Sequence, residues 1–424
     1  MEFSRKIKLN GYDIHEEGIV LKMLVIKDWF FDMVPRVEIT LTDSKDVLYN
    51  LFPIQDDGII EFEINKNVQE DKKKNPLIVT FNILDWESSP IIIGTNEGHN
   101  HAITGYMNVF DLFHPNVTKS FKEKTSGDVV KDIANTLGIT YTKKFKDETS
   151  DKMNWLQIGQ NNHDMLKYVN ERSYITDDDT TLIYVNIEGE LVYTTLKTEC
   201  EKEVSFVGQM DQEKQADNSQ TNFDDETLGT GENKDKPVFY FSSTFNKTLG
   251  SHNKMATYAS KSTYYDGTLE AFDFPGIGNG DKLLNSLSQR NLNNVNHEVT
   301  HFEFGILNGG DNFTEGVHNE FFHSQVRHEY TMLNFFKNSL TLKIKGNNLI
   351  KKYDVVDIII KEPLTNEINE VHSGKYLVGG VIHTLGDDVK FETTLFLYRS
   401  GINKPSLDAE NLLLDAKRLD GQAD

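Results

Sequence analysis

The chain has 424 residues, of which 38% are hydrophobic and 26% charged, so it can bury a sizeable core and is not broadly disordered. Acidic residues outnumber basic ones by 66 to 44. The resulting net charge of −22 disfavours nonspecific binding of nucleic acid, because a negative surface repels the phosphate backbone. A single cysteine, Cys200, excludes an internal disulfide and a zinc site of several thiolates within one chain.

The longest apolar runs, such as 91–93 and 355–360, have the length of a strand. A membrane-spanning helix needs about 20 apolar residues. The N-terminus carries basic residues, but no apolar segment of signal-peptide type follows them. We therefore expect a soluble protein that is made without a secretory leader and does not insert into membranes.

Residues 1–114 are dominated by short segments in which apolar and polar residues alternate. Alternation with period two is typical of strands that face the core on one side. Strands separated by short polar turns at this spacing are typical of a small antiparallel barrel. The predicted strands are 18–26, 36–42, 59–64 and 77–84.

Residues 115–198 show helical spacing instead. Thr125, followed three positions later by Asp128, is typical of a helix N-terminus, and Gly138 is typical of a helix end. A second helix is predicted from Asn162, and Glu188-Gly189 predicts a hairpin. The apolar positions are Val129, Val130, Ile133 and Leu137 in the first helix and Met165, Leu166 and Val169 in the second, and the hairpin strands are 182–187 and 190–195.

Residues 199–237 are acidic and polar, which predicts a loop whose role the sequence does not assign. The chain beyond this loop predicts a second antiparallel β domain, with an inserted helix at 317–338. Its predicted strands are 238–245, 255–265, 340–344, 355–361, 376–385 and 391–398, and the apolar stripe of the helix is Phe322, Val326, Leu333 and Phe336.

The predicted fold is therefore mainly β with an α+β insert. It comprises two small antiparallel β-barrel domains, an α/β domain and a C-terminal tail. Two β domains of similar size would fit an internal duplication, although the residues themselves show no repeat. The predicted boundaries are 1–114 for the first barrel, 115–198 for the α+β domain, 199–237 for the acidic loop, 238–401 for the second barrel with inserted helices, and 402–424 for the tail.

The segment His297-Glu298-Val299-Thr300-His301 matches the H-E-x-x-H pattern of zinc peptidases, in which both imidazoles lie on one face of a helix. The neighbouring residues are β-branched and alternate as in a strand. Residues four apart on a strand are separated by about 13 Å, too far to share one metal. We expect no metal and no cofactor, with His297 and His301 as the candidates if a metal is bound.

Other residues that could carry chemistry form no catalytic set. His318 and His323 lie five apart on a predicted helix and point in different directions. His99 and His101 are predicted to lie in a polar turn, and Asp177-Asp178-Asp179 in a solvated one. The sequence has neither a P-loop nor a G-x-S-x-G elbow. We therefore predict no catalytic residues and no enzyme activity.

Residues 376–385, the polar turn Gly386-Asp387-Asp388 and residues 391–398 resemble the last hairpin of the central baseplate hub protein of contractile-tailed phages. The late-control tail protein and the hub half of type VI secretion spike proteins share that architecture. The segment 349–361, the helix at 125–141 and Trp155-Leu156-Gln157 extend the resemblance over most of the chain. The hairpin residues are Tyr376, Val378, Val381, His383, Leu395 and Leu397.

The resemblance implies a homotrimer in the baseplate of the virion, assembled in the host cytoplasm. Two barrels per chain would give a ring with pseudo-sixfold symmetry that matches a hexameric tail tube. The partners would be the tube protein, other baseplate proteins and a trimeric cell-puncturing spike, on which Leu407, Leu412 and Leu414 of the tail would dock. The ring would leave a channel for DNA ejection without specific nucleic-acid binding.

Two alternatives stay open at this point. One is a zinc peptidase that uses His297 and His301. The other is a carbohydrate-binding module of a tail fibre, which the aromatic content of 11% suggests.

Overall fold

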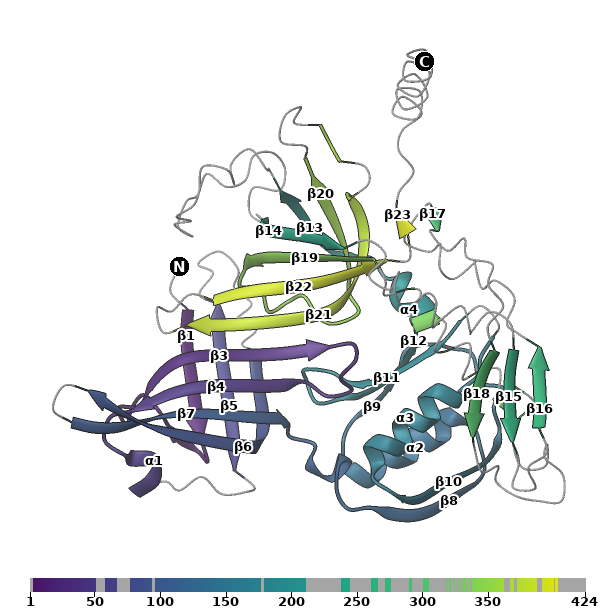
Figure 1. The fold of residues 1–424 in the computed structure, drawn as a ribbon, viewed down its shortest axis with the longest axis horizontal. Coiled ribbons are helices and arrows are strands. Elements are labelled where there is room, and N and C mark those ends of the chain that lie inside the picture. The colour runs from purple at the N-terminus through teal and green to yellow at the C-terminus, as the bar shows by residue number, and fades with distance from the viewer. Residues whose placement is uncertain are drawn as a thin grey trace.

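A computed structural model of the chain has a mainly β fold, as the sequence predicts. One 13-stranded sheet dominates it, and smaller sheets and a few helices lie beside this sheet (Figure 1). The structure describes residues 3–50, 58–66, 77–93, 96–176, 179–210, 238–244, 261–265, 271–275, 290–291, 300–304, 338–361, 367–369, 372–386, 391–399 and 401–402, with single positions between 318 and 335.

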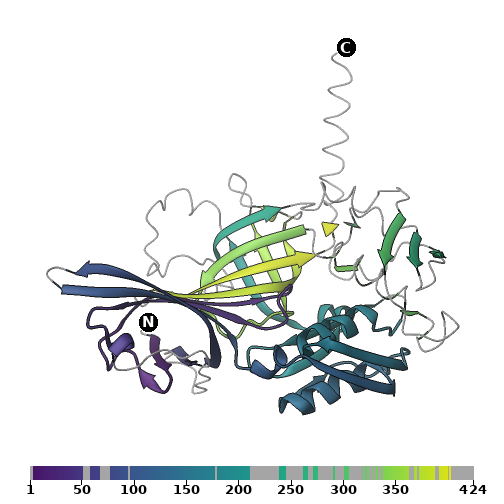
Figure 2. The ribbon, with the colours of Figure 1, turned by 60° about the horizontal axis from the view of Figure 1, so that its bottom comes forward.

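The strands of the large sheet come from both ends of the chain. The two groups meet where β3 (Val20–Trp29) pairs antiparallel with β21 (Gly374–Gly386), and the sheet curls on either side of this junction (Figure 2). The order is β14 (Val238–Thr244), β19 (Asn338–Lys345), β22 (Phe391–Arg399), β21, β3, β4 (Arg36–Asp43), β7 (Asn96–Met107), β6 (Leu77–Ile93), β5 (Ile59–Lys66), β1 (Phe3–Leu9) and β2 (Tyr12–Asp13), while β20 (Val355–Ile360) pairs with β21, and β13 (Val204–Met210) with β20.

Several expectations about these strands are corrected. The strands predicted for two separate domains belong to one continuous sheet, because β3 and β21 form a backbone ladder. Part of the predicted acidic loop forms β13. The region around His99 and His101, predicted as a polar turn, is strand β7, and β1 lies where no strand is predicted.

The two groups of strands have the same topology. In chain order, β3, β4, β5, β6 and β7 correspond to β14, β19, β20, β21 and β22. In both groups the spatial order is first, second, fifth, fourth and third strand. The large sheet therefore consists of two repeats joined edge to edge.

The correspondence extends to single residues. Between the first two strands of each repeat, the ladder shifts between Leu21 and Met23 in one copy and between Val238 and Tyr240 in the other, and the remaining pairs follow with a constant offset. A second register shift occurs at equivalent positions of β6 and β21. Because a bulge adds one residue and bends the strand, bulges at matching places show an internal duplication that the residues alone do not reveal.

The repeats differ in the neighbouring strand of the sheet, which lies beside β5 in the first repeat and beside β20 in the second. In the first repeat β1 pairs antiparallel with β5, whereas in the second β13 pairs parallel with β20. β13 is reached from the α+β unit that lies between the two repeats in the chain. The duplication therefore covers the five strands from β3 to β7 and from β14 to β22.

The large sheet has one apolar face and one polar face. On β4, Val37, Ile39 and Leu41 are buried, whereas Arg36 is exposed and Glu38 half-buried. Successive side chains of a strand point to opposite faces, so the buried set packs inside the curl. Along β4 the second face remains open in the single chain, whereas around Leu377 and Tyr398 the sheet packs against Leu182 and Tyr184 of the α+β unit.

The unit between the repeats follows the predicted order. α2 (Ser126–Leu137) begins at Thr125, whose side chain accepts a hydrogen bond from the Asp128 backbone in a capping box, and ends at Gly138 with φ +68°. α3 (Asn162–Arg172) buries Met165, Leu166 and Val169, as predicted. The remaining elements are η1 (Phe110–Leu112), β8 (Val117–Lys124), β9 (Tyr141–Lys143), β10 (Met153–Gln160), the hairpin β11 (Thr181–Val185) and β12 (Leu191–Thr195), and α4 (Leu196–Cys200).

Smaller elements complete the described fold. The segment at 317–338 is helical at its described positions 321, 324, 328, 331, 332 and 335, and Phe321 and Phe335 are buried there. The predicted stripe of this helix lies outside the described residues. Among the residues that are described, no helix has the length and apolar character needed to cross a membrane. The remaining elements are α1 (Val47–Asn50), β15 (Lys261–Tyr265), β16 (Ala271–Pro275), β17 (Arg290–Asn291), β18 (Thr300–Phe304) and β23 (Gly401–Ile402).

Candidate assembly surface

The residues of the predicted hairpin lie on β21 and β22, which pair antiparallel. All six are buried, so they support the sheet from its core and do not form an exposed site. His383 Nδ1 lies 3.0 Å from the Thr393 hydroxyl, across the ladder. Burial lowers the pKa of His383 to about 4. The buried set is Tyr376, Val378, Val381, His383, Leu395 and Leu397.

The junction between the repeats is closely packed. The ladder runs from Gly380 opposite Trp29 to Gly386 opposite Met23. A Cβ on Gly380 would lie 2.8 Å from the Trp29 ring, so glycine lets the indole rest on the backbone of β21. The Trp29 and Phe396 rings meet edge to face with centroids 4.4 Å apart. Aromatic contacts thus continue across the border between the repeats.

A buried ion pair lies beside this junction. Lys352 Nζ is 2.5 Å from Asp28 Oδ1, and the two side chains are only 1% and 10% exposed. The ammonium also donates to the Trp29 carbonyl at 3.5 Å and lies 4.9 Å from the centroid of the Tyr184 ring. Burial raises the pKa of the Asp28 carboxyl, and the Lys352 ammonium opposes that rise. The pair connects β3, the segment before β20 and strand β11 of the intervening unit.

A second buried acid extends this connection. Glu199, on α4, is fully buried and lies 3.4 Å from Lys144 Nζ, and it also pairs with Lys202. Lys202 in turn lies 3.7 Å from Asp354, just before β20. Burial lowers the pKa of the Lys144 amine, and the Glu199 carboxylate opposes this change. These contacts hold the α+β unit in a fixed position against the second repeat.

Sequence reasoning missed both groups. Asp28, Tyr184 and Lys352 are far apart in the chain and form no local motif. Glu199 falls at the start of the segment that predicts an acidic loop. The ladder between β3 and β21 brings Asp28 beside the second repeat, and neither alternation nor spacing predicts which strands pair across 350 residues.

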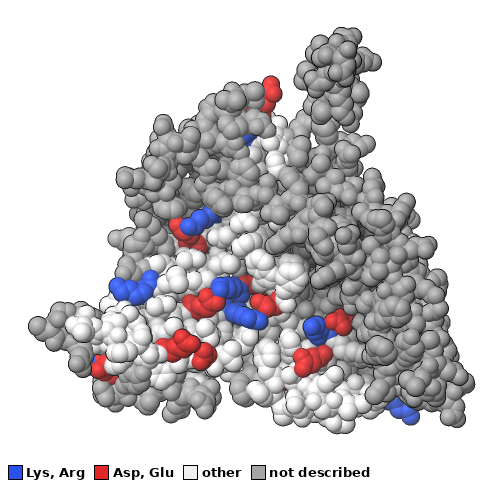
Figure 3. Space-filling view, viewed as in Figure 1, with Lys and Arg blue, Asp and Glu red and all other residues white. Residues whose placement is uncertain are grey.

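The open face of the large sheet carries charges of both signs. Figure 3 shows acidic and basic side chains next to one another over β3 and β4. Lys27 pairs with Glu38, and Arg36 Nη2 lies 2.9 Å from Asp32 Oδ1. Lys343 and Glu392 pair in the second repeat. In the described part of this face the charges are paired and therefore largely neutralised, and they form no run of basic side chains that would hold a phosphate backbone.

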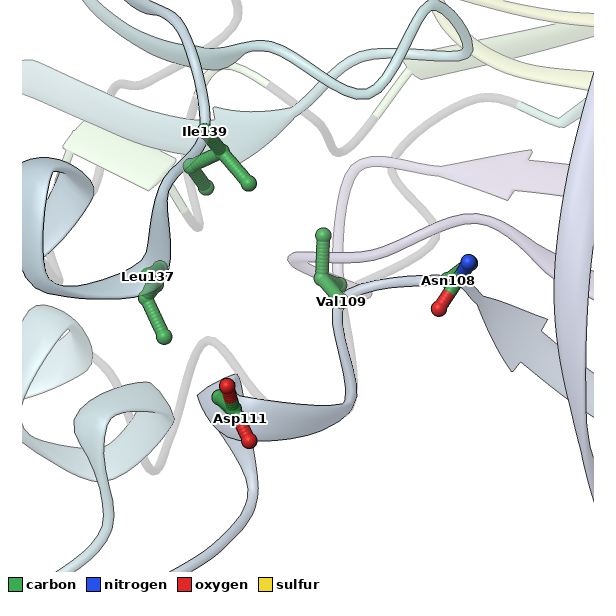
Figure 4. Close-up of a pocket in the computed structure, with 5 residues that line it drawn as sticks. All are labelled: Asn108, Val109, Asp111, Leu137 and Ile139. Atoms are coloured by element: carbon green, nitrogen blue, oxygen red, sulfur yellow. The ribbon is translucent and has the colours of Figure 1, made fainter. Parts of the chain in front are cut away.

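A small pocket lies between the end of β7, η1 and the end of α2 (Figure 4). Its volume is about 180 Å³, and Asp111 is the one ionisable residue among those that line it. The Asp111 carbonyl accepts a hydrogen bond from Asn162 at 3.2 Å, which fixes η1 to the start of α3. A single carboxylate without a nucleophile or base beside it does not form a catalytic set. The pocket lining is Asn108, Val109, Asp111, Leu137 and Ile139.

The structure places one of the two candidate metal ligands. His301 lies on β18, a strand paired with β15, whereas His297 lies outside the described residues. His318 Nε2 lies 2.9 Å from the Arg172 carbonyl oxygen, and His323 is outside the described residues. Within the described ranges, no group of three or more histidine, cysteine or acidic side chains could hold a metal ion.

The remaining predicted positions have structural surroundings or are not described. Asp179 Oδ1 accepts backbone hydrogen bonds from Thr180 and Lys197, so it fixes the start of the β11–β12 hairpin. The predicted tail residues lie outside the described part of the chain; they are Leu407, Leu412 and Leu414.

No protein-family model and no curated protein sequence matches this chain. Solved structures match it over nearly its whole length. A tail protein from Neisseria meningitidis MC58 is 11% identical with a TM-score of 0.55, covering 95% of this chain and 98% of its own. The 43 kDa tail protein of prophage MuSo2 from Shewanella oneidensis is 13% identical with a TM-score of 0.56, covering 94% and 97%. The chain has the fold of these tail proteins.

The resemblance to phage tail proteins that the hairpin residues predict is thereby confirmed for the fold. A component of the type VI secretion system from Escherichia coli also matches, with 10% identity, a TM-score of 0.44 and coverage of 95% of this chain and 80% of its own. The tail-protein fold covers both sheet repeats and the unit between them, because the matches to the first two structures span 95% and 94% of the chain.

Replacing Lys352 by methionine should destabilise the fold. The change leaves the Asp28 carboxylate buried without its partner, which costs about 3–5 kcal/mol of unfolding free energy at pH 7. The loss should shrink as the pH falls, because burial raises the pKa of Asp28 and the protonated carboxyl needs no partner. Urea unfolding at several pH values measures both effects.

Lys351→Met is the matched control, because Lys351 pairs with Glu188 at the surface, where an ion pair contributes about 0–1 kcal/mol. The double variant Asp28→Asn, Lys352→Met should recover part of the loss. Equal losses in Lys351→Met and Lys352→Met would contradict the importance of the buried pair.

His383 should make the fold less stable in acid. Its pKa is lowered from 6.5 to about 4 by burial, so between these values the unfolded chain binds more protons than the folded one. Stability should therefore fall as the pH drops through this window, by up to about 3 kcal/mol from this group. His383→Gln should remove that part of the pH dependence in urea unfolding, whereas His15→Gln, at an exposed position, should not.

Proposed function

We propose that this chain is a structural hub of a phage tail baseplate that works as a homotrimer. The duplicated sheet carries the proposal, because two equivalent repeats per chain would supply six equivalent lobes from three chains. Around the axis of such a ring the amino-acid sequence would repeat three times, whereas the backbone fold of the lobes would repeat six times. It can therefore join a hexameric tube on one side to a trimeric spike on the other.

The electrostatics support a channel through this ring. Three chains would each contribute a net charge of −22, and the open face of the sheet presents paired charges. With the polar face toward the lumen, few unpaired basic groups would be available to exchange for the counterions of DNA. DNA would then pass without binding. The hub would act by joining a hexameric tube to a trimeric spike and not by catalysing a reaction, so it would need no catalytic residues.

The proposed organisation keeps the two repeats as the tube-like lobes. Residues 1–114 and 238–401 would form adjacent β-barrel lobes, with 115–198 as the α+β domain, 199–237 as a connection that also supplies β13 to the second lobe, and 402–424 as the spike-binding tail. The proposed partners are the tail tube, other baseplate proteins and the spike, in the virion. The tail-protein fold and the repeat support this arrangement.

Oligomer measurements test the proposal. Native mass spectrometry over a range of concentrations should give three chains, and negative-stain images should show a ring with six lobes and a central hole. A monomer at all concentrations, both alone and with a co-expressed spike, would contradict it.

Removal of the residues after Ile402 tests the proposed role of the tail. The truncated chain should unfold at the temperature of the full chain, because its last described contact is the short β23 ladder to β17. Its binding to the spike should weaken at least tenfold in a pull-down titration. A triple variant, Leu407→Ser, Leu412→Ser and Leu414→Ser, should show the same loss, whereas unchanged spike binding would remove the tail from the contact.

A further inference from the structure

Each repeat ends in a strand edge, and the two repeats use these edges differently. The outer edge of β3 pairs with β21, which joins the repeats within one chain. The equivalent of β3 in the second repeat is β14, which pairs with β19 on one side and has no strand ladder on its other side in the described part of the chain. Within the described residues, the sheet therefore ends at β14 without a further ladder.

The fourth strand of each repeat shows the complementary difference. β21 pairs with β22 along one edge, and its second half, Gly380–Gly386, pairs with β3 along the other. β6 is the equivalent of β21, and β5 covers only its first half, Leu77–Asn82. Beyond this point the described structure gives β6 one ladder, with β7. Glu87, Ser88 and Ser89 are exposed there, and Figure 1 shows this part of β6 and β7 extending from the body of the sheet.

The duplication relates the edges of β6 and β14 to the internal β21–β3 ladder, because β21 and β3 are the equivalents of β6 and β14. Each residue of the β21–β3 ladder has an equivalent in the other repeat. When every residue is replaced by its equivalent, β21 becomes β6 and β3 becomes β14. The ladder Ile382 opposite Lys27 and Thr384 opposite Val25 becomes Glu87 opposite Thr244 and Ser89 opposite Ser242. In the described part of one chain, neither strand of the converted pair has a ladder along the edge in question, and the two strands lie at different places of the sheet (Figure 1).

We propose that the second half of β6 in one copy of this chain pairs antiparallel with β14 of a second copy, in the register that places Ser89 opposite Ser242. The contact repeats the internal junction between two molecules, so it is head-to-tail and closes into a ring when the rotation fits. It rests on the proposed homotrimer and names the strands that form its interface.

Residue chemistry limits the length of this ladder. Pro90, equivalent to Leu385 of the internal junction, has no backbone N–H, and proline in a sheet is found where that group would face away from a ladder. The intermolecular ladder therefore centres on Glu87, Ser88 and Ser89. The internal junction pairs seven residues of β21. A shorter ladder gives a weaker contact, so the isolated protein should dissociate on dilution while its internal junction stays closed.

Disulfide cross-linking tests the register. In a Cys200→Ser background, Ser89→Cys and Ser242→Cys in one chain should form covalent dimers and trimers under mild oxidation, seen on a non-reducing gel and reversed by a thiol. Directly opposite residues of an antiparallel pair have Cα atoms about 4.5–5.5 Å apart, which suits a disulfide. Mixing the two single-cysteine proteins should give dimers and no trimers.

Two matched variants control the result. Ser89→Cys with Ser243→Cys shifts the register by one residue, which places the thiols on opposite faces, so cross-linking should fall at least tenfold. Thr384→Cys with Val25→Cys, the internal equivalent, should form a disulfide within one chain and shows that this geometry accepts the bond. Circular dichroism confirms that each variant keeps its sheet content.

The outcomes separate this inference from the proposed function. A trimer by native mass spectrometry without the Ser89–Ser242 cross-link would overturn the strand pairing and leave the homotrimer in place. Equal cross-linking of both registers would also overturn it, because random collisions would then explain the bond. A monomer without cross-links at any concentration would overturn both proposals, whereas register-specific trimers support both.

Discussion

The backbone ladder between β3 and β21 is the interaction on which the rest of the structure depends. It converts two similar sets of strands, more than 200 residues apart, into one continuous sheet. Close packing makes the ladder specific, because Gly380 admits the Trp29 ring and a side chain at that position would not. The polar face of both repeats is then one surface, and the apolar faces of both lie within the curl.

The buried ion pair gives this junction a defined geometry. Replacing two well-packed apolar residues by charges brings little net stability, since desolvation offsets the attraction. An ammonium that must meet Asp28, a backbone carbonyl and an aromatic ring does, however, restrict how β3, β11 and the start of β20 can be placed. Together with Glu199 and its two lysines, it connects the α+β unit to the segment before β20.

Local signals in the sequence predicted local structure well. The capping box at Thr125 and the alternation in 36–42 gave α2 and β4 nearly to the residue. β7 was missed because Gly98 and Asn100 resemble a turn, although His101 is buried and accepts a hydrogen bond from Trp86 Nε1 at 3.0 Å. The duplication was hidden because the repeats preserve ladder register and bulges, not side chains. The strand pairs that join the two repeats are long-range, and a residue pattern does not specify its partner strand.

The α+β unit occurs once per chain, between two repeats that are otherwise alike. In an annulus built from such chains, every second lobe would therefore follow an α+β unit in the chain. The strand beside its third strand would be parallel, as β13 is to β20, whereas β1 is antiparallel to β5. The backbone that faces a sixfold neighbour can be uniform while the periphery keeps only threefold character. One polypeptide would thus present different symmetries at two radii.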